Sequence, residues 1–271
     1  MLKNYTKGAP SGPTNIYIPK THPKIIVVMP ALNAEKTLEK TVMDFPKDFA
    51  TKTILVDDGS WDKTASIARK LGLKVFVHTN NIGYGGNQKT CYLEALKENP
   101  DAVVMIHPDY QYDSRLIADL VKPITEGRYD MMYGNRIRTR SQVLNGGMPK
   151  IKYYGNRFYC ILENIVLGAN FSEYFSGMRA YSATLLKNIP FQRFSNDFVF
   201  DQEMMIVSYA LGYKIGEIDI PVRYFSEASS IRFFKGAKFL IDTFIILIKY
   251  ILFKLHFYED TIFQIQHADK T

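Results

Sequence analysis

Acidic side chains follow two apolar runs of the sequence that have the length of buried strands. Asp57 and Asp58 come directly after TILV, and Asp109 ends the run DAVVMIHPD. Adjacent carboxylates repel one another unless hydrogen-bond donors or a cation offset their charge. Hard cations such as Mg²⁺ and Mn²⁺ prefer carboxylate and phosphate oxygens and keep coordination positions open for substrate. We therefore predict that Asp109 binds Mg²⁺ or Mn²⁺, with phosphate oxygens of a bound molecule completing the coordination.

The same acids also have structural explanations. Asp58 or Ser60 is suited to cap the helix that follows, because Asp and Ser side chains accept hydrogen bonds from the first free N–H groups of a helix. Asp109 is alternatively a turn residue ahead of Gln111, and His107 beside it is a potential nitrogen ligand. The local sequence leaves these alternatives open.

Apolar runs of strand length alternate with helical stretches from Lys24 onward. The runs are KIIVVMPAL, TKTILVDDG, KVFVHT and DAVVMIHPD, and helices are predicted over residues 35–44, over residues 62–71 and from the turn NNIGYGGN to about Lys97. This alternation indicates parallel strands with right-handed crossovers. The uninterrupted runs IIVV and TILV indicate helices on both faces. The predicted fold is α/β, with a mixed, mainly parallel sheet flanked by helices.

Ligands of open α/β sheets bind beyond the carboxyl ends of the strands. Three of these exits read Pro30-Ala31-Leu32-Asn33, Asp57-Asp58-Gly59-Ser60 and His107-Pro108-Asp109-Tyr110-Gln111. The first exit does not carry the glycine-rich fingerprint that a nicotinamide-dependent dehydrogenase needs there. We expect the polar side chains of the three exits to form one site.

The second half of the chain mixes shorter elements. They are the strand DMMYGNR, a long basic loop, a helix over residues 150–167, the segment FSGMRAYS, a helix after Asn196 and a strand pair near KIGEIDIPVRYF. The loop IRTRSQVLNGGMPKIKYYGNR is suited to close over a ligand or to bind anionic headgroups, and it is alternatively a solvated loop. Asp201 and Glu203 lie at the predicted start of a helix, where capping is the structural alternative.

Residues 234–257 form a predicted helix that is rich in Phe, Ile and Leu. At 100° per residue, a narrow stripe holds its charged residues Lys235, Lys238, Asp242 and Lys249, and nearly all other positions are apolar. The charges interrupt the apolar run below the roughly 18 residues that a membrane span needs. We expect this helix to lie in the bilayer interface or against a partner. Burial within its own domain is the alternative.

Composition and charge limit the class of partner. A formal net charge of +7 suits an anionic partner, but the basic residues do not form the dense runs that are typical of nucleic-acid binding. We therefore predict no nucleic-acid partner. The two cysteines, Cys91 and Cys160, lie in predicted helices without CxxC spacing, and the N-terminus has no apolar signal core. These features favour a cytoplasmic location. Residues 1–23, rich in Gly, Pro, Ser and Thr, are predicted to be a flexible arm.

The motifs PALNAE, VDDGSWDKT, NNIGYGGNQKT and HPDYQYD occur in an order that resembles family 2 glycosyltransferases with the GT-A fold. The resemblance implies a GT-A domain over residues 24–233, followed by a membrane-interfacial or oligomerisation helix and tail over residues 234–271. It implies that Pro30, Asn33 and Asp58 border the nucleoside of a nucleotide sugar. Asp109 takes the metal position of the family's D-x-D element, and His107 stands where the first Asp is usual. We also count Asp57, Gly85, His107 and Gln111 among the donor-binding residues.

Gln111 and the segments GNR, SGMRAYS and PVRYFSEASS resemble the relatives that glycosylate polyprenyl phosphates. This resemblance makes Arg136 and Arg179 candidates for contact with phosphate during catalysis, with Arg223 aligned less securely. A departing diphosphate needs such cationic donors. A hydroxyl acceptor would require a general base, and Asp201 is the candidate, whereas a phosphate acceptor is already an anionic nucleophile.

The leading hypothesis is a metal-dependent, inverting transferase that moves a hexose from a UDP- or GDP-sugar to polyprenyl phosphate or a lipid-linked glycan. It places the protein on the inner face of the membrane. The second hypothesis keeps the donor chemistry but uses a soluble or protein-borne hydroxyl acceptor, with the terminal helix as a contact in a homo-oligomer. The third is a non-catalytic, nucleotide-sugar-binding scaffold in which His107 marks lost catalysis.

Overall fold

The computed structural model describes residues 22–137, 139–221, 233–257 and 259–265, and these residues contain a seven-stranded sheet. Its strands are β1 (Ile25–Ala31), β2 (Lys52–Asp57), β3 (Lys74–Val77), β4 (Ala102–Met105), β5 (Met131–Asn135), β6 (Arg179–Ser182) and β7 (Ile215–Asp219). Their order across the sheet is β3-β2-β1-β4-β6-β5-β7. β6 runs antiparallel to both of its neighbours, and the other pairs are parallel. The predicted mixed, mainly parallel sheet is therefore confirmed.

Nine α-helices accompany the sheet within the described residues. They are α1 (Leu38–Met43), α2 (Thr64–Lys70), α3 (Tyr84–Lys97), α4 (Ile117–Thr125), α5 (Arg140–Asn145), α6 (Lys150–Leu167), α7 (Ala183–Asn188), α8 (Phe200–Ala210) and α9 (Phe233–Lys254). The predicted helices are present, although α1 begins three residues later than expected because the chain first makes a turn after Asn33. α5 lies inside the segment that was expected to be a loop. Of the predicted strand pair near residue 215, one strand is described, and the rest lies outside the described residues.

The sheet is covered on both faces, as its apolar strands predict. In β1, Ile26 and Val28 pack into a core with α3, α7, α8 and α9, whereas Val27 and Met29 pack into a second core with α1, α2 and α4. Alternate residues of a strand point to opposite faces, so a run without polar residues can serve two cores at once.

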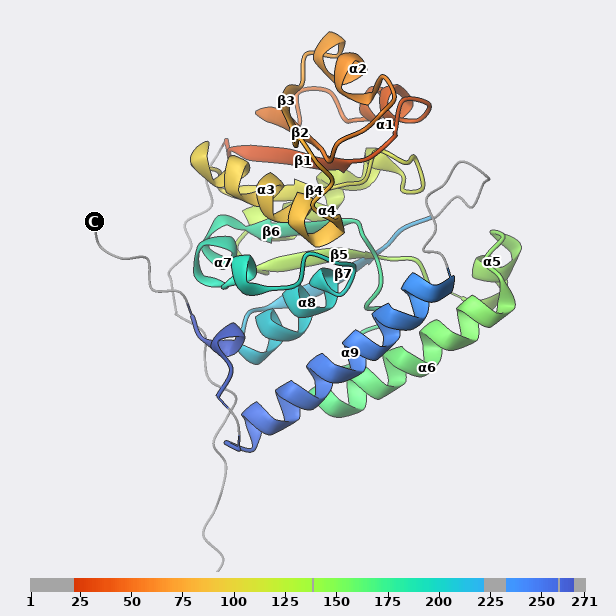
Figure 1. Ribbon diagram of the computed structural model, residues 1–271, viewed down its shortest axis with the longest axis vertical. Helices are drawn as coiled ribbons and strands as arrows, with labels where there is room; N and C mark the ends of the chain where they lie inside the picture. The colour runs from red at the N-terminus through yellow and green to blue at the C-terminus, as the bar shows by residue number, and fades with distance from the viewer. Residues whose placement is uncertain (1–21, 138, 222–232, 258, 266–271) are drawn as a thin grey trace, which may run out of the picture.

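The last helix packs beside α6 along one side of the molecule (Figure 1). Its buried apolar side chains, Ile246, Leu247 and Tyr250, belong to the core under α8. The charged stripe makes ion pairs within the helix and with other parts of the chain. Lys238 contacts Asp242 of the same helix at 2.7 Å and Asp197 before α8 at 3.0 Å, and Lys249 contacts Asp260 at 3.0 Å. Exposed apolar residues occupy other positions of α9, namely Ile241, Phe244, Ile245, Ile248, Ile251 and Leu252, and Leu255 directly after the helix is exposed as well.

The topology brings the expected site residues to one edge of the sheet. β4 and β2 both flank β1 in parallel orientation, so the three exits identified in the sequence are neighbours. β5 and β7 run in the same direction as β4, because β6 is antiparallel to β4 and to β5. Their exits therefore lie at the same edge, where the strand order changes.

Candidate functional site

The two acids at the exit of β2 accept hydrogen bonds from donors of the protein itself. Asp57 and Asp58 are buried, and Asp57 accepts a hydrogen bond from the Ser60 hydroxyl. Asp58 accepts from Ile82 N at 3.0 Å and Gly83 N at 3.2 Å, and its Oδ1 lies 2.8 Å from His78 Nδ1. Asp58 thus fixes the loop that leads into α3. Neither Asp58 nor Ser60 caps α2, because that helix begins at Thr64, whose N–H donates to Asp62 at 2.9 Å.

Asn33 links the exits of β1 and β2. Its N–H donates to Ser60 Oγ at 2.8 Å, and its side-chain Oδ1 accepts from Trp61 N at 3.1 Å. Its φ of +52° is a left-handed conformation that asparagine tolerates better than most residues. Pro30 lies within β1, paired with Val56. Pro30 and Asn33 therefore lie at the end of β1 beside the exit of β2, and their contact with a nucleoside stays a prediction.

The exit of β4 carries the predicted cation ligand. Asp109 Oδ1 accepts a hydrogen bond from the backbone N–H of Gln111 at 3.1 Å, which fixes the turn that both residues form. Tyr110 between them has a left-handed φ of +60°, and its hydroxyl donates to Asp44 at 2.9 Å. A bulky residue in this conformation is strained, and such strain is concentrated at functional sites.

Tyr84 and Asp201 join His107 in one hydrogen-bonded group. The Tyr84 hydroxyl donates to Asp201 Oδ2 at 2.7 Å and lies 2.9 Å from His107 Nε2. Gln88 Nε2 donates to the other oxygen of Asp201 at 3.1 Å. Burial, and after it the charge of Asp201, raises the pKa of Tyr84 well above its usual value, so the phenol keeps its proton. Asp201 is buried here, with hydrogen bonds at both carboxylate oxygens.

The first turns of α3 pack closely against the loop before α8. Gly85 N donates to Asn196 O at 2.8 Å, and a Cβ on Gly85 would lie 2.5 Å from Ser195 O and 2.6 Å from Phe200 Cβ. Close packing therefore explains why glycine stands here, and a role of Gly85 in binding stays a prediction. Asn87, two residues further and buried, donates to Val56 O at 3.1 Å and connects α3 to the exit of β2.

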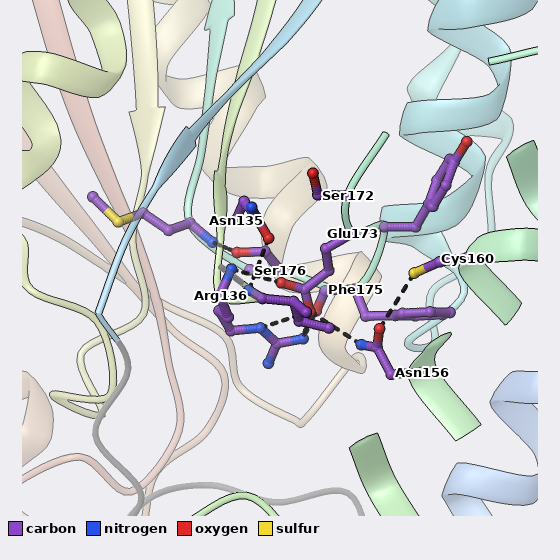
Figure 2. Close-up of polar contacts among 12 residues, drawn as sticks. Asn135, Arg136, Asn156, Cys160, Ser172, Glu173, Phe175 and Ser176 are labelled. Carbon is purple, nitrogen blue, oxygen red and sulfur yellow. Dashed lines mark hydrogen bonds and ion pairs between the residues drawn. The ribbon is translucent and has the colours of Figure 1, made fainter. Parts of the chain in front are cut away.

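Arg136 follows β5 and is paired with a buried acid (Figure 2). Its Nε donates to Glu173 Oε1 at 2.8 Å, its Nη2 contacts the same oxygen, and its backbone N–H donates to Glu173 Oε2 at 2.8 Å. Asn156 of α6 also donates to Glu173, at 3.1 Å, so the acid connects α6 to the site edge. The guanidinium is thereby fixed in place, and its contact with phosphate stays a prediction.

Arg179 is fully buried in β6 and contacts backbone oxygens. Its Nε donates to Ser176 O at 2.8 Å, Nη1 to Asp201 O at 2.7 Å and Nη2 to Tyr174 O at 3.0 Å. The side chain therefore holds the loop before β6 and the start of α8 together. Its predicted role in phosphate contact is not tested by this arrangement. Arg223 lies outside the described residues.

Sequence reasoning missed Tyr84, Gln88 and Asn87. Tyr84 and Gln88 are four residues apart and so share one face of α3, which was the available signal within the motif NNIGYGGNQKT. Their partner Asp201 is 117 residues from Tyr84, and no local pattern connects the two.

The donor set at this edge fits a divalent cation only if a substrate supplies most ligands. Within the described ranges, no three His, Cys, Asp or Glu side chains are grouped so that they could hold a metal ion. Asp109 offers carboxylate oxygen and His107 offers imidazole nitrogen at the exit of β4. A diphosphate would supply further oxygens, which is the arrangement that Mg²⁺ and Mn²⁺ adopt in nucleotide sites.

Comparison with solved structures confirms the fold. Glucosyl-3-phosphoglycerate synthase from Mycobacterium tuberculosis, in complex with UDP, superimposes with a TM-score of 0.65 over 84% of this chain and 80% of that chain, at 19% identity. A complex of the same enzyme with Mn²⁺, UDP and glucosyl-3-phosphoglycerate gives a TM-score of 0.62 over 88% of this chain and 82% of that chain, also at 19% identity. The architecture is the GT-A fold that the sequence predicts.

Curated relatives cover most of the chain. An uncharacterized protein of Methanocaldococcus jannaschii is 32% identical over 86% of this chain and 93% of its own length. A dolichyl-phosphate hexose transferase of Haloferax volcanii is 30% identical over 75% of this chain and 84% of its own length. A UDP-N-acetylglucosamine–dolichyl-phosphate N-acetylglucosaminyltransferase of Methanococcus voltae is 27% identical over 74% of this chain and 86% of its own length. Residues 26–189 match the family model of Glycosyl transferase family 2. With more than half of the chain inside that match, this protein belongs to glycosyl transferase family 2.

Proposed function

We propose that the protein transfers a hexose from a UDP- or GDP-sugar to a polyprenyl phosphate, with inversion, at the inner face of a membrane. The observation that carries the acceptor is the pair of relatives named as dolichyl-phosphate sugar transferases, which match over about three quarters of this chain. In this reaction the bond from the anomeric carbon to the nucleoside diphosphate breaks, and a bond from that carbon to an acceptor oxygen forms.

The state of Asp201 supports a phosphate acceptor over a hydroxyl. A hydroxyl nucleophile needs a base that takes its proton, whereas a phosphate oxygen is already anionic. Asp201 is buried and accepts hydrogen bonds from Tyr84 and Gln88, so both of its oxygens are engaged within the protein. In our proposal Asp201 organises the site and removes no proton.

On the donor side, the residues of the strand exits bind and orient the nucleotide sugar. Pro30, Asn33 and Asp58 form the wall beside the nucleoside, and Asp109 with Gln111 faces the diphosphate in our assignment. A bound Mg²⁺ or Mn²⁺ would supply positive charge to the departing diphosphate. Arg136, immobilised by Glu173, adds a guanidinium at the exit of β5. Its fixed position lowers the entropy cost of contacting a phosphate.

An apolar surface formed by α6 and α9 supports a membrane-bound acceptor. Exposed residues of α6 are spaced three and four apart and so form one stripe: Ile151, Tyr154, Phe158, Ile161 and Ile165. The exposed apolar residues of α9 lie on the neighbouring helix (Figure 1). We call these residues together the two-helix face. Large contiguous apolar patches on a protein surface mark membrane or protein contacts.

The charges around the two-helix face match an anionic bilayer surface. Exposed cations stand at the ends of the two helices: Lys150 begins α6, Lys235 is near the start of α9, and Lys254 ends it. The Arg140 guanidinium lies 5.4 Å from the ring centroid of Tyr154, which is part of the face. Basic residues beside an apolar helix surface bind interfaces that contain anionic lipids. Within the described residues, no helix is both long and apolar enough to cross a membrane.

Both helices of the two-helix face contact residues of the proposed site. Asn156 of α6 donates to Glu173, the partner of Arg136. The Lys235 ammonium of α9 lies 5.9 Å from the ring centroid of Phe198, which stacks on Tyr84. A protein lying on the bilayer by this face would hold the site edge close to lipid headgroups. In our proposal this is how the phosphate of a polyprenyl lipid reaches the anomeric carbon of the donor.

A transfer assay with purified full-length protein tests the proposal. UDP- and GDP-sugars are offered with short-chain polyprenyl phosphate, with and without Mn²⁺ or Mg²⁺, and the lipid product is separated and weighed by mass spectrometry. We expect a metal-dependent glycosyl phospholipid whose anomeric configuration is opposite to that of the donor. Donor turnover that reaches only hydroxyl acceptors would contradict the lipid proposal, and metal-dependent donor binding without any turnover would favour a scaffold.

A further inference from the structure

His107 is held on one side by Tyr84 and Gly177, which come from two other parts of the chain. The Tyr84 hydroxyl lies 2.9 Å from His107 Nε2, and the two rings stack with centroids 5.3 Å apart. Gly177 packs against the same edge of the imidazole, where a Cβ would lie 2.9 Å from Cδ2 and 3.0 Å from Nε2. Tyr84 in turn is held by Asp201. The position of the ring is therefore set by tertiary contacts.

The hydrogen bonds also decide which ring nitrogen carries the proton. A phenol has one proton, and a carboxylate can only accept, so the Tyr84 proton points to Asp201. The lone pair of the Tyr84 oxygen then faces His107 Nε2, which must be the protonated nitrogen to make a hydrogen bond. A neutral imidazole has a single N–H, so Nδ1 carries the free lone pair. Nδ1 of His107 makes no hydrogen bond to any residue in the described part of the chain.

We propose that Tyr84 is a positioning residue that holds His107 as its Nε2–H tautomer, so that Nδ1 binds the cation of the donor site together with Asp109. This inference rests on the proposed donor site, since a cation is expected there only if a nucleotide sugar binds. It gives Asp201 a structural role that does not involve the acceptor. The carboxylate orients the phenol, the phenol orients the imidazole, and the imidazole completes the cation site.

The nitrogen ligand has a consequence for the choice of metal. Mg²⁺ takes oxygen ligands almost exclusively and gives up its waters reluctantly, whereas imidazole suits first-row transition-metal ions. An Asp at position 107 would offer oxygen, and His107 offers nitrogen. The site should therefore bind Mn²⁺ more tightly than Mg²⁺ in the presence of a nucleoside diphosphate. Partners that orient a ligating histidine usually change metal affinity by about 10- to 100-fold when they are removed.

The first experiment determines the tautomer of His107 in the metal-free protein. Full-length protein is labelled with ¹⁵N in its five histidine rings, and His107 is assigned by the signals that His107→Gln loses. At pH 8 we expect a protonated Nε2 and an unprotonated Nδ1 in the wild type, and a mixture of tautomers in Tyr84→Phe. Tyr133→Phe is the matched control, because it also removes a phenol that donates to a carboxylate, Glu217, at 2.7 Å. A protonated Nδ1 in the wild type, or an unchanged spectrum in Tyr84→Phe, would overturn the inference.

The second experiment measures the affinity and the ligands of the bound metal ion directly. Mn²⁺ binding is measured by electron paramagnetic resonance with UDP and, in parallel, with GDP. We expect a nitrogen coupling that changes when histidine is ¹⁵N-labelled, a loss of Mn²⁺ affinity of about tenfold in Tyr84→Phe, and none in Tyr133→Phe. His107→Asp should move the preference toward Mg²⁺. Bound Mn²⁺ without nitrogen coupling, or no Mn²⁺ binding with either nucleotide, would contradict the proposal.

Failure of this inference and failure of the proposed function give different results. If the tautomer and the nitrogen coupling are found but no glycosyl lipid forms, then the acceptor is wrong and the role of Tyr84 stands. If glycosyl lipid forms with Mn²⁺ bound only through oxygen, then the transferase is right and the role of Tyr84 is wrong. Circular dichroism and a melting curve establish that each variant is folded before either measurement.

Discussion

Asp58 is a buried acid that organises a loop whether or not it also contacts a nucleotide. It accepts hydrogen bonds from Ile82 N and Gly83 N and lies 2.8 Å from His78 Nδ1. In Asp58→Asn one acceptor oxygen becomes an NH₂ group that faces other donors, and each unmatched buried donor costs about 1–3 kcal/mol. We therefore expect a loss of about 2 kcal/mol in the free energy of unfolding, measured by urea denaturation. The control is Asp119→Asn, an exposed acid on α4, which should lie within about 0.5 kcal/mol of the wild type.

Gly85 offers a second test at the scale of one residue. A Cβ there would lie 2.5 Å from a backbone oxygen, so either α3 or the loop before α8 must shift. We expect Gly85→Ala to destabilise the protein by about 3 kcal/mol, as overpacking does. Gly155→Ala is the matched control, because a Cβ at Gly155 in α6 meets nothing within 4 Å and alanine favours the helix. Equal effects of the two variants would show that packing at Gly85 is not the constraint.

Residue types at the strand exits could be predicted because short-range rules govern them. An apolar run that ends in an acid is visible within one segment, and Asp57, Asp58 and Asp109 were found this way. The contacts of these acids could not be predicted, since the hydrogen-bond partners of Asp58 come from the loop at residues 78–83. Asp201 was expected as a base and is bonded to Tyr84 and Gln88, 117 and 113 residues away.

At the scale of elements, α9 shows what a helical wheel can and cannot tell. The sequence predicted the helix and its charged stripe, but a wheel does not say which side faces the protein. Lys238 and Lys249 pair with Asp197 and Asp260 of the domain while their side chains stay 57% and 40% exposed, and apolar residues occupy further exposed positions of the helix. These ion pairs depend on acids in other elements.

The contact between α8 and α9 also contains an acid with a shifted pKa. Glu203 lines a pocket with Lys238, Asp242 and Lys249, and burial raises its pKa from 4.5 to about 7, while the Ser195 N–H, Lys89 and Lys249 oppose that shift. The folded protein thus retains a proton that the unfolded chain releases above pH 4.5. The free energy of unfolding should therefore fall as pH rises from 4.5 to 7, and the full cost remains above that range.

Glu203→Gln removes this titration and keeps an oxygen that can accept from Ser195 N, 2.7 Å away in the wild type. We expect the variant to be more stable than the wild type by about 2 kcal/mol at pH 8 and by little at pH 4.5. Chemical denaturation at both pH values measures the difference. Glu39→Gln, at an exposed position of α1, is the control that should show no such pH dependence. A constant difference between Glu203→Gln and the wild type would exclude the titration of Glu203 as its cause.

At the scale of the whole molecule, the parallel half of the sheet followed from the alternation of strands and helices. The insertion of β6 between β4 and β5 could not be predicted from that alternation, because β6 is a four-residue strand that pairs antiparallel with both neighbours. Such a short strand has no distinctive periodicity, and its place depends on long-range packing. The same holds for the neighbouring positions of α6 and α9. The sequence predicted each helix but gave no sign that the two lie side by side.

The two-helix face predicts how the molecule meets a bilayer. Phe158 of α6 is 65% exposed and Phe244 of α9 is 50% exposed. If both helices enter the interface, each Phe→Glu change loses apolar burial and adds a charge to desolvate, so each single variant should bind vesicles less well. We expect Phe158→Glu/Phe244→Glu to lose at least about tenfold in affinity for vesicles that contain anionic lipid, measured by sedimentation. Wild-type binding should weaken as salt rises, because the flanking lysines contribute.

Met43→Glu is the matched control, since Met43 is 68% exposed on α1, away from α6 and α9 in Figure 1. This variant should bind vesicles as the wild type does. Loss of binding in Phe244→Glu alone would restrict the membrane contact to α9. If both single variants bind normally while the wild type sediments as a dimer that the double variant disrupts, then the face joins two copies of the chain. A dimer of that kind would bury the apolar stripes against each other, and the lipid acceptor would have to approach the strand exits from another side.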